Sequence, residues 1–167
     1  MSAAAWLAEG IALIEDEMIA VDECRWDDWL ALYLPDCEYW MPAWKADGAI
    51  GANPKTELSH IYYGNRAGLE DRVARICSGR SVASVPMPRT LHLVGQVRAL
   101  APLANDRMHL RSSWSTQVFF RRTQETHDFF GRAEHELVRR DGALRIAKKK
   151  IIMLNDYIPT MLDIYCV

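Results

Sequence analysis

The sequence predicts an α+β fold, in which N-terminal helices pack on one side of a long, strongly curved antiparallel sheet shaped as a cone or roll. Two observations support this prediction. Apolar residues recur at helical spacing before residue 35, whereas after residue 80 they alternate with polar residues over long stretches. Helices followed by a run of strands are typical of this fold class. The length of 167 residues suits one domain, so residues 1–167 are expected to form a single domain.

The first expected helix covers residues 3–24. Its apolar residues follow one another at spacings of four, three, four and three and form one stripe: Leu7, Ile11, Ile14, Met18 and Val21. A second, short helix is predicted for residues 26–34, with Pro35 as its stop signal. The stretch CEYWMPAW then indicates a strand that stops at Pro42, and residues 45–57 have no periodicity and predict a loop.

The densest stretch of the chain is IYYGNRAGLEDRVARI, which raises the question of whether it does chemistry or builds a scaffold. After an extended segment, Asn65 or Gly68 is expected to cap a helix whose apolar face contains Leu69, Val73, Ile76 and Cys77. Acidic residues in its first turn suit the helix dipole, and Arg75 follows Asp71 by four residues, which favours an ion pair. These charges are therefore interpreted as helix electrostatics, which favours a scaffold.

Residues 107–123 predict a long strand with one apolar face, because every second residue shares a side: Met108, Leu110, Ser112, Trp114, Thr116, Val118 and Phe120. The next strand contains Gly131, which predicts a bulge or bend. Asp141-Gly142 is a strong hairpin signal before the last strand. Strands of about 15 residues exceed the usual length of about five or six, so this sheet must bend strongly.

Composition excludes several classes of protein. The net charge of −2 argues against binding to nucleic acid through phosphate neutralisation. The N-terminal segment lacks a positive leader and is interrupted by acidic residues, so neither a signal peptide nor a membrane span is expected. The cysteines at positions 24, 37, 77 and 166 share no close spacing, which predicts a reduced, cytoplasmic protein.

A metal site has little support in the pattern of histidines, which stand at positions 60, 92, 109, 127 and 135. A distant set of His127, His135 and Glu134 is possible in principle, but alternation along a strand places Glu134 on the face opposite both histidines. No nucleophile elbow or phosphate-binding glycine loop occurs. In the run 148–150, the same alternation separates Lys149 from its two lysine neighbours.

Acid–base catalysis in a cavity of the cone is an alternative function that the sequence does not exclude. Candidate lining residues are Tyr33, Tyr39, His92, His109 and Trp114. A histidine with a tyrosine or aspartate is sufficient for proton transfer next to a carbonyl or for dehydration. One alternative is therefore a stand-alone dehydratase or isomerase that uses His92 or His109 with Tyr33 or Tyr39. Another is a small-ligand binding module without turnover.

Four segments together resemble the small (β) subunits of bacterial aromatic-ring-hydroxylating dioxygenases. The segment most specific for this family is Pro88, Arg89, Thr90 and His92 before a strand. At Gly95-Gln96 the chain departs from the Ser-Asn that is usual in the family. The ending NDYI…LDIY and the segment from Ile61 are most similar to the benzoate, toluate and anthranilate branch. The four segments are RWDDWL with DCEYWMPA, IYYGNRAGLEDRVARI, SVPMPRTLHLVGQV and LRIAKKKIIMLNDYI.

The resemblance implies a cystatin-like, NTF2-like cone and a structural role without catalytic, cofactor-binding or metal-binding residues in this chain. It implies a large α subunit as partner, which carries a Rieske [2Fe–2S] cluster and a mononuclear Fe(II). It also implies a separate reductase that supplies electrons from NADH. Three β subunits are expected to form a trimer within a hetero-hexamer, with no nucleic acid or membrane as partner.

Several residues are predicted to support the structure or to form interfaces. These are Arg89, His92, Trp40, Tyr62 and Tyr157. Trp44 and Tyr63 are further aromatic candidates, since aromatic anchors concentrate at interfaces. The apolar tail MLDIYCV is expected to lie on the surface of the free chain and to be buried by assembly.

Overall fold

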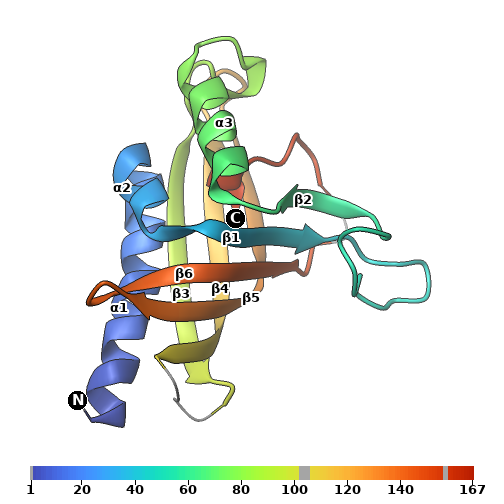
Figure 1. The fold of residues 1–167 in the computed structure, drawn as a ribbon. Coiled ribbons are helices and arrows are strands. Elements are labelled where there is room, and N and C mark those ends of the chain that lie inside the picture. Colours follow the sequence, from blue (N-terminus) through green and yellow to red (C-terminus); the bar gives the residue numbers. More distant parts are fainter. Residues whose placement is uncertain (1, 102–105, 156–157) are drawn as a thin grey trace.

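The computed structural model describes residues 2–101, 106–155 and 158–167, and it confirms an α+β cone (Figure 1). Six strands form one sheet in the order β2-β1-β6-β5-β4-β3. All neighbouring strands are antiparallel except β1 and β6, which are parallel. The elements are α1 (Ala3–Asp22), α2 (Trp26–Ala31), β1 (Tyr33–Pro42), β2 (Ser59–Tyr63), α3 (Arg66–Cys77), η1 (Val82–Ser84), β3 (Arg89–Ala99), β4 (Arg107–Phe120), β5 (Glu125–Arg140), β6 (Ala143–Met153) and η2 (Ile164–Cys166).

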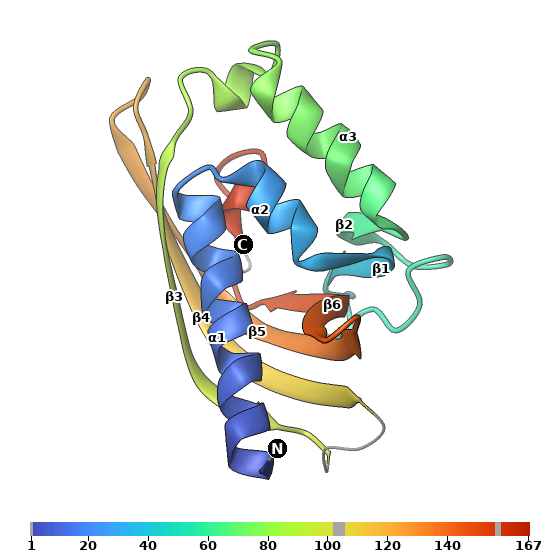
Figure 2. The same cartoon turned by 60° about the vertical axis from the view of Figure 1, so that its left-hand side comes forward.

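Helix α1 lies along the inner side of the sheet (Figure 2). Its N-terminus is capped by Ser2, whose hydroxyl accepts a hydrogen bond from the backbone N–H of Ala5 at 3.2 Å. Its C-terminus ends in a Schellman motif, because Cys24 adopts a left-handed φ of 54° and the N–H of Arg25 bonds to the carbonyl of Ala20 at 2.8 Å. The predicted helix 3–24 is thus confirmed, with its last two residues forming the cap.

The predicted second helix, residues 26–34, is too long. Helix α2 ends at Ala31, and Tyr33 already belongs to β1 because the sheet captures this segment: the N–H of Ile146 bonds to the carbonyl of Leu32 at 2.8 Å. Pro35 therefore lies inside β1 instead of ending the helix. It falls in the stretch between Tyr33 and Glu38 where the pairing with β6 is interrupted, which is where a residue without an N–H is tolerated.

Helix α3 begins at Arg66, and Asn65 is the cap, because its side-chain oxygen accepts from the N–H of Gly68 at 3.1 Å. This start places the acidic residues in the second turn, so their predicted position in the first turn is wrong. The predicted pair of Asp71 and Arg75 is not among the ion pairs of the described residues. The exposed charges of this helix pair differently: Arg66 contacts Glu70 at 2.9 Å.

The long strands agree with the alternation in the sequence. Along β4, the even-numbered residues from Met108 to Val118 are buried. Asp141 and Gly142 both have positive φ, at 53° and 82°, which identifies a type I′ turn between β5 and β6. Gly131 is not a bulge, because the pairing of β4 with β5 runs through it without a shift. It permits a close approach of β6, since a Cβ atom there would lie 2.0 Å from the carbonyl oxygen of Ile152.

The C-terminal segment enters the cone. Asp163, Ile164, Tyr165, Cys166 and Val167 are all buried within the chain, with exposures of at most 3%. The prediction that the tail MLDIYCV lies on the surface of the free chain is therefore wrong for these five residues. The reason is that the open end of a curved sheet needs apolar filling, and this segment supplies it without a second chain.

Candidate functional site

The interior of the cone contains a buried ionic cluster around Glu17, a fully buried residue of α1. Lys149 of β6 places its Nζ 2.8 Å from Glu17 Oε1, and the Tyr33 hydroxyl donates to the same oxygen. His135 of β5 places its Nε2 3.3 Å from Glu17 Oε2. The Lys149 ammonium also lies 5.4 Å from the ring centre of Tyr39. Strands β1, β5 and β6 thus converge on one carboxylate of α1.

The charges of this cluster are fixed by its surroundings. Burial alone would raise the pKa of Glu17, but the charge of Lys149 and the hydrogen bond from His135 outweigh it and lower the pKa from 4.5 to about 2. Burial lowers the pKa of His135, so the imidazole is neutral near pH 7. Burial, together with the charge of Glu17, raises the pKa of Tyr33 well above 10.0. The cluster is therefore an ion pair with two neutral hydrogen-bonding neighbours.

A second polar cluster joins the end of α1 to β3. Asp22 Oδ1 lies 2.6 Å from Nδ1 of His92 and accepts from the Thr90 hydroxyl at 2.7 Å, while Asp22 Oδ2 accepts from the backbone N–H of His92 at 2.9 Å. Burial would raise the pKa of Asp22, but the hydrogen bonds from His92 outweigh it and lower the pKa. The carboxylate orients the imidazole and leaves Nε2 buried, without a partner among the described residues.

An oriented Asp–His pair has the form of an acid–base device, but among the described residues neither Asp22 nor His92 lines the cavity inside the cone. The cavity inside the sheet measures about 10 Å³, which is room for about one water molecule. Small-molecule sites usually measure about 300–1,000 Å³. The lining explains the lack of space, because α1, the sheet and the C-terminal segment meet there: Ile14, Met18, Val94, Ser112, Trp114, Ala133, His135, Lys149, Ile151 and Val167.

The proposed acid–base partners are not brought together. His109 lies on the outer face of the sheet, where its side chain is 50% exposed and Nε2 is 3.8 Å from Glu136. His92 is inside the cone but pairs with Asp22, whereas Tyr33 pairs with Glu17. The hydroxyl of Tyr39 is buried and has no hydrogen-bond partner among the described residues. The geometry therefore does not support a dehydratase built from these residues.

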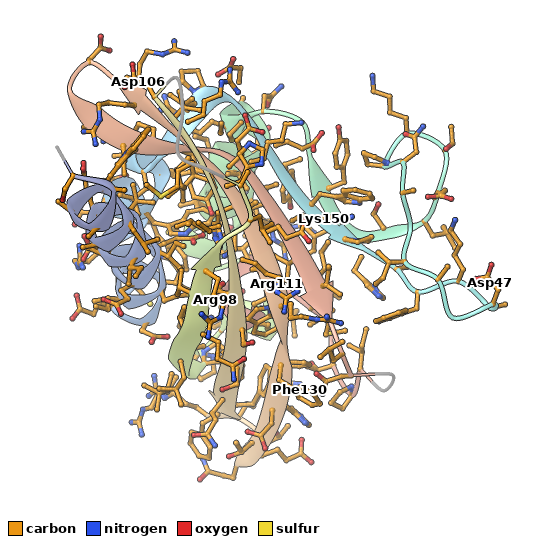
Figure 3. The ribbon with its side chains drawn as sticks, turned by 90° about the horizontal axis from the view of Figure 1, so that it is seen from below. Asp47, Arg98, Asp106, Arg111, Phe130 and Lys150 are labelled. Carbon is orange, nitrogen blue, oxygen red and sulfur yellow. The ribbon has the colours of Figure 1, made fainter. Side chains whose placement is uncertain are left out.

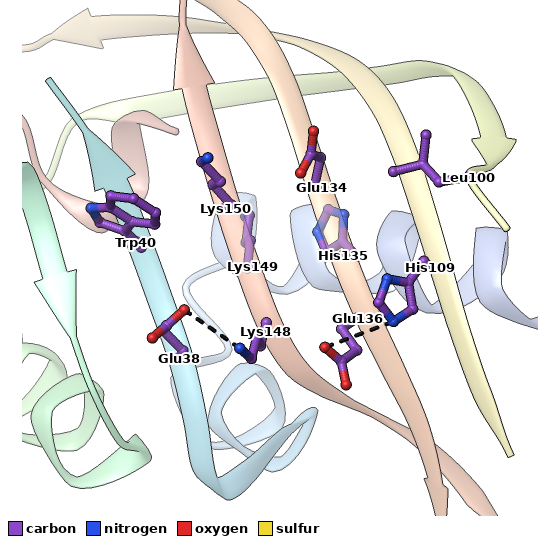
Figure 4. A pocket seen from close by; sticks show the side chains of 10 residues that line it. All are labelled: Glu38, Trp40, Leu100, His109, Glu134, His135, Glu136, Lys148, Lys149 and Lys150. Atoms are coloured by element: carbon purple, nitrogen blue, oxygen red, sulfur yellow. Dashed lines mark ion pairs between the residues drawn. The ribbon is translucent and has the colours of Figure 1, made fainter. Parts of the chain in front are cut away.

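The outer face of the sheet carries a depression of about 250 Å³ (Figure 4). Lys148 and Lys150 flank it, whereas Lys149 is buried in the cone. The predicted separation of Lys149 from its two lysine neighbours is therefore confirmed. Much of the charge of the depression is compensated locally: Lys148 lies 4.0 Å from Glu38, and the ammonium of Lys150 lies 4.8 Å from the ring centre of Trp40. These pairs stabilise the surface of the sheet and do not form a catalytic arrangement.

The predicted interface residues lie in different places. Trp40 and Tyr62 are neighbours on the outer face, paired between β1 and β2, and the indole N–H of Trp40 donates to Ser59 at 2.8 Å. Arg89 is exposed at the start of β3, and His92 points into the cone. Tyr157 lies outside the described residues. Their roles at an interface stay predictions.

The dense stretch from Ile61 to Ile76 serves the scaffold. Arg72 of α3 forms a bidentate ion pair with Asp163, in which Nε of Arg72 lies 2.7 Å from Oδ1 of Asp163. Asp163 in turn caps η2, because its carboxylate accepts from the N–H of Ile164 at 2.8 Å. Arg66 also donates to the carbonyl of Tyr33 at 3.2 Å. The stretch therefore holds the C-terminal segment and β1 in place.

Sequence reasoning missed Glu17, Asp22 and Asp163 as partners. It separated Lys149 from Lys148 and Lys150 but did not predict that Lys149 is buried. Glu17 carried a signal, because it stands one turn after Ile14 and one turn before Val21 on the buried stripe. In the part of the chain that the structure describes, no three histidine, cysteine, aspartate or glutamate side chains gather in a form that could hold a metal. Nor is any helix there long and apolar enough to cross a membrane.

Comparison with known proteins identifies the family. A family model described as ring hydroxylating beta subunit matches residues 16–160. Benzoate 1,2-dioxygenase subunit beta from Acinetobacter baylyi is 37% identical over 145 residues, covering 87% of this chain and 84% of that protein. The anthranilate 1,2-dioxygenase small subunit from the same organism is 36% identical over 144 residues and covers 86% of each chain.

Solved structures agree in fold. The beta subunit of a benzoate 1,2-dioxygenase from Burkholderia mallei superposes with a TM-score of 0.77 at 32% identity and covers 96% of both chains. A putative scytalone dehydratase from Novosphingobium aromaticivorans has a TM-score of 0.68 at 14% identity, covering 96% of this chain and 93% of its own, which shows the NTF2-like fold alone. Because the family model spans most of the sequence and the relatives match along nearly their whole length, the chain belongs to the family of ring-hydroxylating dioxygenase beta subunits.

Proposed function

We infer that this chain is the structural, non-catalytic small subunit of a multicomponent dioxygenase that cis-dihydroxylates an aromatic acid of the benzoate or anthranilate type. Its partner is a large subunit that carries a Rieske [2Fe–2S] cluster and a mononuclear Fe(II), supplied with electrons from NADH by a reductase. Three copies of each subunit form a hetero-hexamer in the cytoplasm. The similarity to the small subunits of benzoate and anthranilate dioxygenases supports the substrate class.

One observation carries the non-catalytic role. The segment from Ile164 to Val167 is buried inside the cone, and the cavity that Val167 helps to line there measures about 10 Å³. The ionisable groups that line this cavity, Lys149 and His135, both bind Glu17. Elsewhere in the cone, Asp22 is bound by His92. An interior of this kind stabilises the fold and leaves the chemistry to the partner.

The test reconstitutes the enzyme from separately purified parts. The chain alone is expected to be colourless, free of iron and inactive toward benzoate, and to raise the turnover of the large subunit supplied with reductase and NADH. The variant His92→Ala in the same mixture should leave turnover per assembled complex unchanged. Turnover of benzoate or of any dehydration substrate by the lone chain, lost in His92→Ala, would contradict the proposal.

A further inference from the structure

The outer face of the sheet is not covered by any described helix, because the helices pack on the inner side (Figure 2). Large apolar side chains nevertheless gather on it. Leu93 and Phe130 are 58% and 48% exposed, and both pair with Ser115 of the strand between them. Leu91 precedes Leu93 by two residues on β3, so it lies on the same face, and it is 51% exposed. A solvated sheet face is normally polar, whereas a contiguous exposed apolar patch marks a contact surface.

Cationic side chains stand next to this patch, among them Arg98, Arg111 and Lys150 (Figure 3). Arg98, Arg111, Glu134 and Lys150 occupy one row across four neighbouring strands. Arg98 and Arg111 are directly opposite each other, an arrangement of like charges that destabilises a sheet unless an anion compensates it. Neither arginine forms an ion pair with a described residue. In the next row, the Nε atom of Arg132 is buried and lacks a hydrogen-bond partner among those residues.

The remaining acidic side chains at this end of the outer face do not neutralise the arginines. Glu38 pairs with Lys148, and Glu136 is occupied by Arg107 and lies near His109. The row therefore keeps a positive excess, with Glu134 as its single carboxylate. We name the surface formed by Leu91, Leu93, Arg98, Arg111, Phe130, Arg132 and Lys150 the cationic sheet face.

The complementary surface occurs on the same chain. The solvent side of α1 carries Glu15 and Asp16, and neither forms an ion pair with a described residue. Ile19 follows one turn later and is 46% exposed. Ala8 and Ala12 continue this side toward the N-terminus and permit close approach, because they are small. We name the surface formed by Ala8, Ala12, Glu15, Asp16 and Ile19 the acidic helix ridge.

We propose that the cationic sheet face of one copy docks on the acidic helix ridge of a second copy. The two surfaces cannot meet within one chain, because α1 packs on the inner side of the sheet. Sheet-to-sheet docking of two copies is disfavoured, since it would bring Arg98 and Arg111 of both copies together. A face-to-ridge contact matches cations to anions and apolar to apolar side chains.

This contact joins two different surfaces, so it is heterologous and closes into a ring when the rotation between copies permits. The inference deepens the proposed function, on which it rests for a ring of three copies. It assigns the contact between small subunits to surfaces other than the C-terminal segment, which the cone already buries.

Charge reversal tests the pairing. The sheet variant carries Arg98→Glu and Arg111→Glu, and the helix variant carries Glu15→Lys and Asp16→Lys. Each should weaken self-association of the purified chain at least tenfold, measured by sedimentation equilibrium at low ionic strength. The fourfold variant, with both pairs reversed, should regain association, because its charges are complementary again. Circular dichroism checks that every variant is folded.

A control separates pairing from net charge. Arg121→Glu with Arg122→Glu changes the net charge as the sheet variant does, at an exposed turn outside the cationic sheet face, and should leave association unchanged. A monomeric wild type, or a fourfold variant that does not reassociate, would overturn the proposal.

Each variant is also mixed with the large subunit. A sheet variant that self-associates normally but no longer binds the large subunit would place that subunit on this face and leave the proposed function standing. Failure of the wild-type chain to bind the large subunit would instead contradict the proposed function.

Discussion

Replacing Lys149 with methionine should be among the most damaging single changes to this fold. The substitution removes the cation from the buried pair and keeps a side chain of similar length, so Glu17 stays enclosed without its counter-charge. Removing one partner of a buried pair costs about 3–5 kcal/mol of unfolding free energy. The pKa of Glu17 gives the same order of magnitude, because its fall from 4.5 to about 2 corresponds to about 3 kcal/mol of stabilisation.

The pH dependence should change sign in this variant. In the wild type, the pKa of Glu17 is lower in the folded chain than in the unfolded chain, so its contribution is complete above pH 4.5 and is lost as the pH falls toward 2. Without Lys149, burial is the largest remaining influence and should raise the pKa of Glu17 above its ordinary value. The variant should then become more stable as the pH falls from about 7 to about 5.

Urea unfolding followed by tryptophan fluorescence measures both effects. The matched control is Lys148→Met, a neighbouring lysine whose side chain is 57% exposed, and it should cost less than about 0.5 kcal/mol. Adding Glu17→Gln to Lys149→Met should recover part of the loss, because no uncompensated charge remains. A loss below about 1 kcal/mol at pH 7 would show that the Glu17 carboxylate is not held as an enclosed ion, and the reasoning would fail.

Three further predictions concern packing and titration. Gly131→Ala should lower the free energy of unfolding by more than about 2 kcal/mol, because the new Cβ would lie 2.0 Å from a backbone oxygen of β6. Gly95→Ala is the control: its Cβ would have nothing within 4 Å, so its free energy of unfolding in the same urea assay should be nearly unchanged. Deleting residues 163–167 should lower the free energy of unfolding by more than about 5 kcal/mol, since several buried side chains are lost. A deletion variant that keeps the near-ultraviolet circular dichroism of the native chain would contradict this. Asp22→Asn should lower the urea midpoint at neutral pH and reduce its fall below about pH 4, because contacts with His92 lower the pKa of Asp22 and make its contribution disappear in acid.

Local sequence signals predicted the elements that depend on local geometry. The alternation along β4 follows from the twofold period of a strand, and the turn at Asp141-Gly142 follows from the positive φ that glycine and aspartate accept. The start of α3 was predictable within one turn, because an asparagine cap satisfies its first N–H groups. These features need no knowledge of distant residues.

The wrong or missing predictions concern features that depend on contacts between residues far apart in the sequence. Helix α2 ends early because β6, more than a hundred residues later, captures Leu32. The contacts of Glu17 with Lys149 and His135 span 132 and 118 residues, so no spacing motif could link them. The burial of the tail likewise depends on Arg72 and the closed shape of the cone. A carboxylate on an apolar stripe was the one local sign of this interior, and it did not identify the partners.

The parallel pairing of β1 with β6 has a consequence for synthesis. The strand Tyr33–Pro42 leaves the ribosome early, but its neighbour in the sheet, Ala143–Met153, is made about 110 residues later, which takes roughly 5–20 s at bacterial rates of elongation. During this interval β1 and β2 form an unfinished edge with an apolar side. Nascent chains are therefore expected to depend on holding factors at the ribosome, and N-terminal fragments that stop before Ala143 should aggregate instead of forming a domain.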